Sequence, residues 1–184
     1  MIVDKCNGYY PAMGYDTNGY ADNSTDLVAQ NDSYGKWQKP VCDRQVALNA
    51  STGGAGPLPL ITTLLSSPIN VVSTSIDTTG MGNTNTLLTF TSNISLPLGI
   101  SVTLNFQIQR VYNNGAPLNV GSTYTFATTV VVLESEAFSF QFMDANVPEG
   151  YYTYSVNLST NSIVDITPGA TINNAVLSVL AVAT

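Results

Sequence analysis

The stretch 101-SVTLNFQIQRVYNNG-115 decides the fold class of this chain. Between Val102 and Ile108, apolar residues occupy every second position, and Thr, Asn and Gln fill the positions between them. Because successive side chains of a β-strand point to opposite faces, this alternation predicts a strand over Ser101–Val111 with one buried and one polar face. The Asn-Asn-Gly sequence at 113–115 is typical of a tight hairpin turn.

The same alternation recurs on both sides of this stretch, and Gly, Pro and Asn separate the runs. No segment shows the period of a helix. The strands expected from these runs are Leu58–Leu65, Ile69–Asp77, Thr86–Ile94, Ser101–Val111, Thr123–Leu133, 138–142, 152–158, Ile163–Ile166 and Ala175–Ala183. About eight short strands with such turns predict an all-β fold, a jelly-roll-like β-sandwich, with an up-and-down barrel as the alternative.

The last of these strands, Ala175–Ala183, is apolar on both faces. Such a strand is usually central in a sheet that is covered on both sides. Near a chain end it is also suited to an interface between subunits. Both interpretations stay open at the level of the sequence.

Residues 1–57 differ from the rest, because they are rich in Tyr, Asp, Asn and Gly and have no hydrophobic period. We expect them to form an extended N-terminal arm, or connector, in front of a β-sandwich domain over 58–184. The Gly-Gly-Ala-Gly sequence directly before Pro57 predicts a flexible hinge at Gly53, Gly54 and Gly56.

The composition excludes several classes of function. The chain has no His, which removes the commonest general base and metal ligand, so Ser–His–Asp and Cys–His nucleophile systems are excluded. It carries 5 basic and 12 acidic residues, a net charge of -7, which argues against binding nucleic acid. No apolar run reaches the length of a membrane span. We therefore expect no enzyme activity, no cofactor, no nucleic acid and no membrane insertion.

The acidic residues show no pattern of a metal or hydrolase site. Asp22 and Asp26 lack the spacing of a calcium loop, so a solvated loop is the simpler interpretation. Glu134 and Glu136 are more consistent with a charged strand edge that blocks aggregation than with a catalytic carboxylate pair. We expect no catalytic and no metal-binding residues.

The arm is unusually rich in large aromatic side chains, and disordered segments are normally poor in them. We therefore expect the arm to pack against its own domain, a neighbouring subunit or a carbohydrate. The residues predicted to make this contact, between subunits in the preferred interpretation, are Tyr9, Tyr10, Tyr15, Tyr20, Tyr34 and Trp37.

Both cysteines, Cys6 and Cys42, belong to the arm, and no CxxC motif is present. They could be free thiols, one disulfide within the chain, or a disulfide between subunits. The absence of cysteine from the β domain favours a role in fastening the arm over a role in core packing.

Four segments carry a resemblance to a known group of proteins. They are INVVSTSIDTTGMGNTNTLLTFTSNISLPLG (69–99), VTLNFQIQRVYNNG (102–115), AFSFQFMDANVPEGYYTYSVNLS (137–159) and ATINNAVLSVLAV (170–182). They resemble an uncharacterised β-sandwich domain family found in small surface proteins of anaerobic spore-forming bacteria. The plan of arm plus domain is similar to that of endospore appendage (Ena-type) pilins, jelly-roll subunits that polymerise through Cys-bearing N-terminal connectors.

The resemblance implies a structural subunit that self-assembles with identical subunits into an extracellular or spore-surface filament through its arm. In such an assembly the arm pairs with the sheet edge of a neighbour or fills a groove on it. The alternative is a glycan- or receptor-binding jelly-roll module of a surface protein or a phage fibre.

Overall fold

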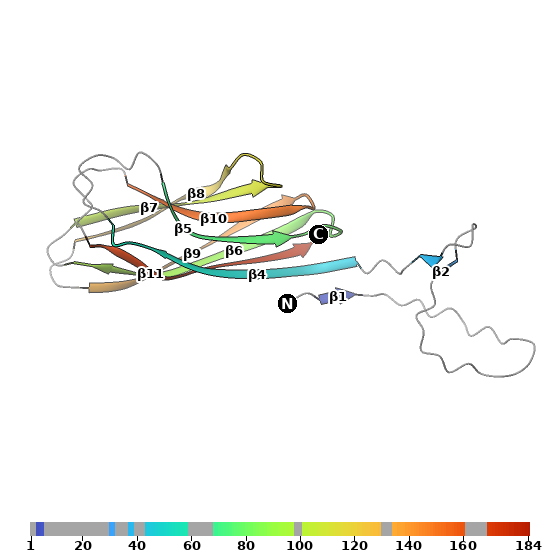
Figure 1. The fold of residues 1–184 in the computed structure, drawn as a ribbon, viewed down its shortest axis with the longest axis horizontal. Coiled ribbons are helices and arrows are strands. Elements are labelled where there is room, and N and C mark those ends of the chain that lie inside the picture. The colour runs from blue at the N-terminus through green and yellow to red at the C-terminus, as the bar shows by residue number, and fades with distance from the viewer. Residues whose placement is uncertain are drawn as a thin grey trace, which may run out of the picture.

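The computed structural model describes residues 3–5, 30–31, 37–38, 43–58, 68–97, 101–129, 134–160 and 169–184. The described residues form strands joined by turns (Figure 1). The strands are β1 (Val3–Lys5), β2 (Gln30–Asn31), β3 (Trp37–Gln38), β4 (Asp43–Ala55), β5 (Ile69–Asp77), β6 (Thr84–Leu96), β7 (Ser101–Tyr112), β8 (Leu118–Thr129), β9 (Glu134–Val147), β10 (Tyr151–Ser159) and β11 (Thr171–Ala183).

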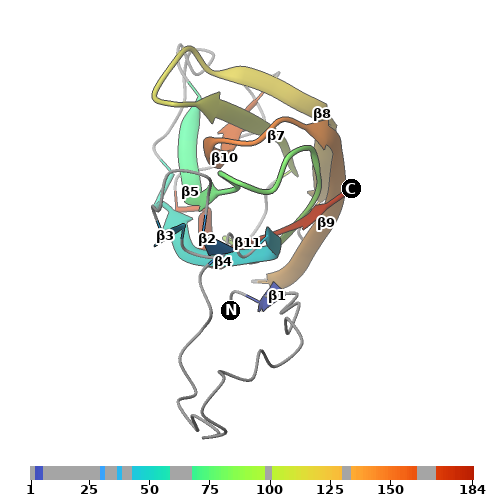
Figure 2. The same cartoon turned by 90° about the vertical axis from the view of Figure 1, so that its right-hand side faces the viewer.

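Two antiparallel sheets pack face to face, as Figure 2 shows. One sheet has the order β1-β4-β11-β6-β9 and the other has the order β5-β10-β7-β8. From β4 onward the chain changes sheet at every step except the β7–β8 hairpin. This is the topology of a jelly roll. The prediction of an all-β, jelly-roll-like sandwich is therefore confirmed.

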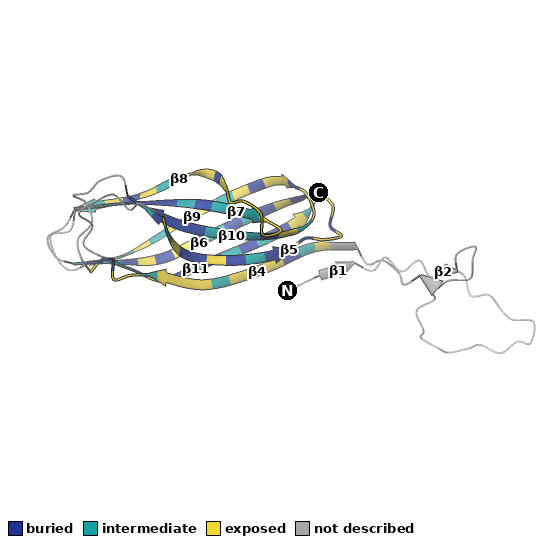
Figure 3. Cartoon of the chain, turned by 45° about the horizontal axis from the view of Figure 1, so that its top comes forward, coloured by how far each residue is buried: buried dark blue, intermediate teal, exposed yellow. Residues whose placement is uncertain are grey.

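The core lies between the two sheets and is built from the inward positions of each strand. In β7 the predicted buried face, Leu104, Phe106 and Ile108, is fully buried. In β6 buried residues occupy every second position from Thr84 to Leu96, so dark and light segments alternate along the strands in Figure 3. Each large apolar side chain buried in this way stabilises the fold by about 1.5–3 kcal/mol.

Aromatic rings connect the sheets where β9 faces β7 and β8. Phe140 stacks on Tyr124 of β8 with ring centroids 3.9 Å apart and on Phe90 of β6 at 4.9 Å. Phe138 lies 4.9 Å from Phe106 of β7. The alternating phenylalanines of β9 therefore pack between strands of both sheets.

The β7–β8 hairpin turns at the predicted position. Asn113 and Asn114 both have positive φ angles, and Gly115 donates its N–H to the carbonyl oxygen of Tyr112 at 2.7 Å. Asn tolerates the left-handed region better than most residues, which explains the pair of asparagines at this turn.

Strand β11 is central in its sheet, between β4 and β6. One of its faces, with Leu177 and Val179, is fully buried in the core. The other face is half-buried to exposed and includes Leu180 and Val182. The prediction of a central position is thus confirmed, but within the described part of the chain nothing covers the outer face.

The predicted glycine hinge is wrong, and the β domain begins earlier than predicted. Gly53 and Gly54 lie inside β4, where Gly53 pairs with Ala175 of β11, and Gly56 follows the strand with a φ of 124°. The domain therefore extends at least to Asp43 rather than beginning at 58. Sequence reasoning missed β4 because few of its residues are apolar.

Close packing explains why two of these residues are glycines. A Cβ atom added to Gly53 would overlap the carbonyl oxygen of Val71 and lie 2.9 Å from the Cβ of Val72, both in β5 of the opposite sheet. A Cβ on Gly54 would lie 2.7 Å from the carbonyl oxygen of Ile172. The glycines thus let β4 approach its neighbours closely.

Most of the predicted strands Leu58–Leu65 and Ile163–Ile166 lie outside the described residues. Leu58 is described and buried, and its N–H donates to the carbonyl oxygen of Ala170 at 2.8 Å. The backbone after β4 is therefore held against the segment that leads into β11.

Candidate functional site

The described part of the arm meets the domain at a sheet edge. Strand β1 pairs antiparallel with the start of β4, with Val3 opposite Val46 and Lys5 opposite Asp43. In Figure 2, β1 lies on the outer side of β4. The edge of β4 thus accepts a strand supplied by the first residues of the arm.

The other predicted arm contacts are not brought together in the described part of the chain. Trp37 lies in β3, opposite Asn31 of β2. The remaining predicted contact residues and both cysteines lie outside the described residues: Cys6, Tyr9, Tyr10, Tyr15, Tyr20, Tyr34 and Cys42. Their roles stay predictions.

An apolar row crosses the outer surface of the β4–β11–β6–β9 sheet. Leu180 of β11 is opposite both Leu48 of β4 and Leu87 of β6, and Leu87 is opposite Met143 of β9. We call these four residues the apolar row. Leu48 is 43% exposed and Met143 52% exposed. Val46 and Val182, opposite each other, flank the row, and Val182 is 42% exposed.

From Val46 of β4 onward, the outward positions of β4, β11, β6 and β9 whose side chains are described carry no charge, and we call this surface the uncharged face; Arg44 precedes it in β4. Its polar members are hydroxyl and amide side chains. Its outward positions are Val46, Leu48, Ala50, Thr52, Asn85, Leu87, Thr89, Thr91, Asn93, Ser95, Ser135, Ala137, Ser139, Gln141, Met143, Val176, Ser178, Leu180 and Val182.

The outer surface of the opposite sheet is polar. There a row of amides crosses all four strands: Asn70 of β5, Asn157 of β10, Gln109 of β7 and Asn119 of β8. The Asn70 Nδ2 donates to Asn157 Oδ1 at 3.1 Å, and Asn157 Nδ2 donates to Gln109 Oε1 at 2.7 Å. Gln109 Nε2 then donates to Asn119 Oδ1 at 2.9 Å. In this amide row the side-chain donors and acceptors bond to one another, and these hydrogen bonds fix the positions of the four side chains.

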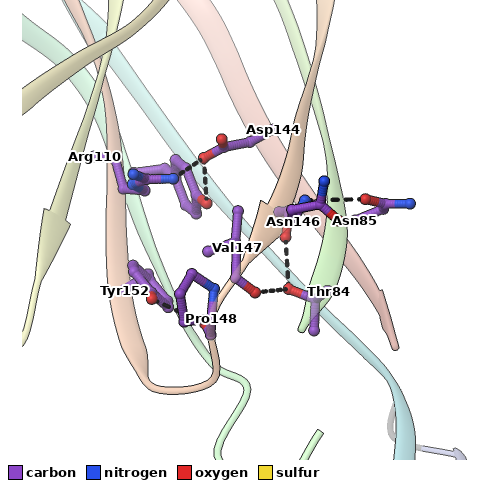
Figure 4. Close-up of polar contacts among 10 residues, drawn as sticks. Thr84, Asn85, Arg110, Asp144, Asn146, Val147, Pro148 and Tyr152 are labelled. Carbon is purple, nitrogen blue, oxygen red and sulfur yellow. Dashed lines mark hydrogen bonds and ion pairs between the residues drawn. The ribbon is translucent and has the colours of Figure 1, made fainter. Parts of the chain in front are cut away.

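A charged cluster connects the two sheets near one end of the sandwich (Figure 4). Asp144 of β9 accepts at one oxygen, Oδ2, from Arg110 Nη1 of β7 at 2.7 Å and from the Tyr154 hydroxyl of β10 at 2.9 Å. Arg110 also lies over the ring of Tyr152, 5.8 Å from its centroid. Two further hydrogen bonds lie at the same end of the sandwich. The Tyr152 hydroxyl donates to the Pro148 carbonyl, and the Thr84 hydroxyl donates to the Val147 carbonyl.

Burial sets the ionisation of this cluster. Desolvation of the Tyr154 phenol, reinforced by the neighbouring Asp144 carboxylate, raises the pKa of Tyr154 above its ordinary value of 10.0. Burial also raises the pKa of the Tyr152 phenol. For Arg110, burial is the largest single effect and lowers the pKa, but the charge and hydrogen bond of Asp144, together with Tyr154, outweigh it and the net pKa is raised. Tyr154 of β10 links its sheet to Asp144 of β9 in the other sheet, and its raised pKa keeps the phenol neutral there.

Sequence reasoning missed this cluster, although a signal for it exists. Arg110 continues the alternating inward positions of Leu104, Phe106 and Ile108 in β7. Asp144 continues the alternating inward positions of β9 after Phe142. Opposite charges that each fall at an inward position of a strand point to a pair across the core.

Beyond this charged cluster, the described residues hold no grouping of side chains that resembles a catalytic or metal site. No group of three or more His, Cys, Asp or Glu among them could hold a metal ion. A hollow lined by Gly53–Gly56 and residues 172–174 is open to solvent and has no ionisable side chain. No helix in the described part of the chain is long and apolar enough to cross a membrane.

A family model described as a domain of unknown function, DUF4489, matches residues 44–182. The chain belongs to the DUF4489 family. The match begins one residue after the start of β4 and ends one residue before the end of β11, so the DUF4489 domain comprises the eight strands of the sandwich and excludes most of the arm. No curated protein matches the chain.

Two solved structures show a distant similarity to this DUF4489 chain. A chain of infectious bursal disease virus, Gx strain, is 12% identical with a TM-score of 0.46, and the match covers 94% of this chain and 36% of that one. The enzymatically active domain of tailspike protein 4 of bacteriophage CBA120 is 16% identical with a TM-score of 0.28, and 72% of this chain and 19% of that one are covered. The chain thus spans well under half of each of these two chains, and neither similarity bears on function.

Proposed function

We propose that the chain is a structural subunit, not an enzyme, that self-assembles with identical subunits into an extracellular or spore-surface filament through its N-terminal arm. The plan of an arm in front of a jelly roll, which resembles that of endospore appendage subunits, motivates the proposal. The arm is the donor and a neighbouring β-sandwich is the acceptor.

The pairing of β1 with β4 is the observation that carries this proposal. Edge strands expose unpaired N–H and C=O groups, and β1 satisfies those at the start of β4. A neighbour's Val3–Lys5 could make the same hydrogen bonds, because the contact depends mainly on backbone groups. Each subunit would then give one arm and accept another, and such a head-to-tail contact grows into an open filament unless it closes into a ring.

The arm aromatics and cysteines would strengthen this contact. Five aromatic side chains buried against a neighbour at about 2 kcal/mol each would contribute roughly 10 kcal/mol before ordering costs. A disulfide between Cys6 or Cys42 of adjacent subunits would then make the filament covalent.

Electron microscopy of the full chain tests the proposal, with a double variant of β1 as the decisive comparison. Val3→Pro with Asp4→Pro removes two N–H donors from β1, whereas Val3→Thr with Asp4→Thr keeps a strand-forming backbone. We expect filaments from the full chain and the Thr variant, and none from the Pro variant or from residues 43–184. Filaments of native diameter from residues 43–184 would refute a role for the arm.

A glycan- or receptor-binding module is the second candidate, favoured by the amide row and the exposed Tyr151 at the end of the same sheet. Aromatic side chains together with a few placed polar groups line most small-ligand sites. A glycan array probed with the full chain separates the two functions. Discrete oligomers that bind a glycan, with no filaments, would favour this module.

A further inference from the structure

We propose that the uncharged face is a second self-association surface, which packs against the same face of another copy of the chain. This contact is independent of the arm. Arms would join subunits head to tail, while the uncharged face would pair them side by side.

The first argument is the arrangement of the exposed apolar residues. Six large hydrophobic residues are exposed in the described part of the chain, and three of them, Leu48, Met143 and Val182, lie on this one face. They are not scattered, because the strand registers place Leu48 and Met143 in one row with Leu87 and Leu180. The row lies near one end of the sheet beside Val46 and Val182, and hydroxyl and amide side chains continue from it along all four strands; apolar contacts bordered by polar ones are typical of a protein interface.

The second argument is charge. The chain carries a net charge of -7, so two copies repel each other wherever their acidic surfaces meet. The uncharged face reduces that penalty, since none of its positions from Val46 onward would bring a charge against its own copy; the charges in this sheet next to it, Arg44 and those of β1, lie at its border. A nucleic acid or an acidic partner would require basic residues, which these positions lack.

The third argument is that the polar rim is self-complementary. Hydroxyls such as Thr91 and Ser139 and the amide of Gln141 can each donate and accept a hydrogen bond. Such groups can pair with their own copies across a two-fold axis, as an isologous contact requires. A rim of like charges would repel its own copy.

The size of the face agrees with a reversible contact. Four strands about 4.8 Å apart and about nine residues at about 3.4 Å each give roughly 500 Å². Two copies would bury about 1,000 Å² in total, the lower bound for a specific interface. The sheets would then pack about 10 Å apart, like the two layers of a sandwich.

Sedimentation equilibrium of the full-length chain in reducing buffer tests this proposal. The parent carries Val3→Pro and Asp4→Pro, so that growth through the arm does not obscure a side-by-side contact. Leu48→Glu with Met143→Glu puts charges at both ends of the apolar row, at positions exposed enough to tolerate them. The matched control is Leu118→Glu. Leu118 is 55% exposed and belongs to β8 of the other sheet.

We expect the double Glu variant to weaken self-association at least tenfold and the control to change it less than twofold. Gln141→Glu, which adds a charge on this face without changing shape, guards against misfolding and should weaken it as well. Mixing the double Glu variant with the corresponding double Lys variant should restore association.

Three outcomes would overturn the proposal. The parent could stay monomeric at the highest soluble concentration, or the control could lose as much association as the double Glu variant. A synthetic peptide of residues 1–42 could also displace the second copy, which would assign the face to the arm.

Discussion

Replacing Asp144 by Asn removes one charge from between the two sheets and keeps the shape of the side chain. Arg110 then faces a neutral amide, and the Tyr154 hydroxyl loses a charged acceptor. A hydrogen bond to a charged group contributes about 1.5–3 kcal/mol, and leaving one member of a buried ion pair alone costs about 3–5 kcal/mol. The Arg110 side chain is 22% exposed and can be partly rehydrated, so the cost should be lower, about 2 kcal/mol.

Urea unfolding and thermal melting of the 184-residue chain measure this loss. About 2 kcal/mol should lower the Tm by about 4–8 °C. Ser139→Ala, exposed on the same strand, is the control and should change stability by less than about 0.5 kcal/mol. The double variant that combines Asp144→Asn with Tyr154→Phe should lose less unfolding free energy than the sum of the two single variants. Both substitutions affect hydrogen bonds at the same Asp144 oxygen. A loss below about 0.5 kcal/mol for Asp144→Asn would refute the view that this cluster ties the sheets together.

Three further predictions concern single features of the sandwich. Gly53→Ala should lower the free energy of unfolding by about 2 kcal/mol, because its methyl group would overlap the Val71 carbonyl oxygen. The control, Thr52→Ala at an exposed position, should not lower it. Equal losses for the two variants would contradict this explanation. The raised pKa of Tyr154 keeps its phenol protonated in the folded state when the unfolded chain loses that proton, so stability should fall as pH rises above about 10. Tyr154→Phe should make that fall shallower, and an unchanged slope in urea unfolding would count against the assignment. A chelator should leave the Tm unchanged, since the described residues hold no metal-binding group; a drop that calcium reverses would prove this wrong.

Most strands of the sandwich could be predicted from the sequence, because one face of each strand is buried and its apolar residues therefore alternate with polar ones. The alternation in Ser101–Val111 and the Asn-Asn-Gly turn predicted β7 and its hairpin, and the structure has both. Strand β5 was predicted with its observed bounds, Ile69–Asp77. Period-two patterns are reliable where a strand separates a dry core from solvent.

Strand β4 and the site features could not be read in the same way. In β4 the glycines reflect close packing against β5 and β11, which a local pattern cannot distinguish from a linker. The Arg110–Asp144 pair joins residues 34 positions apart, and only the folded register brings them together. The apolar row likewise combines four strands, so no single segment of sequence displays it.

The central position of β11 has a consequence for the timing of biosynthesis. Of the sandwich strands, β11 is the last to leave the ribosome, yet it fills the place between β4 and β6. Until it emerges, both neighbours lack their shared partner, and these pairings of high sequence separation form late. Leu180 belongs to β11, so the apolar row is incomplete on a nascent chain. Newly made subunits would therefore become competent to associate through this face only once synthesis has passed the last strand.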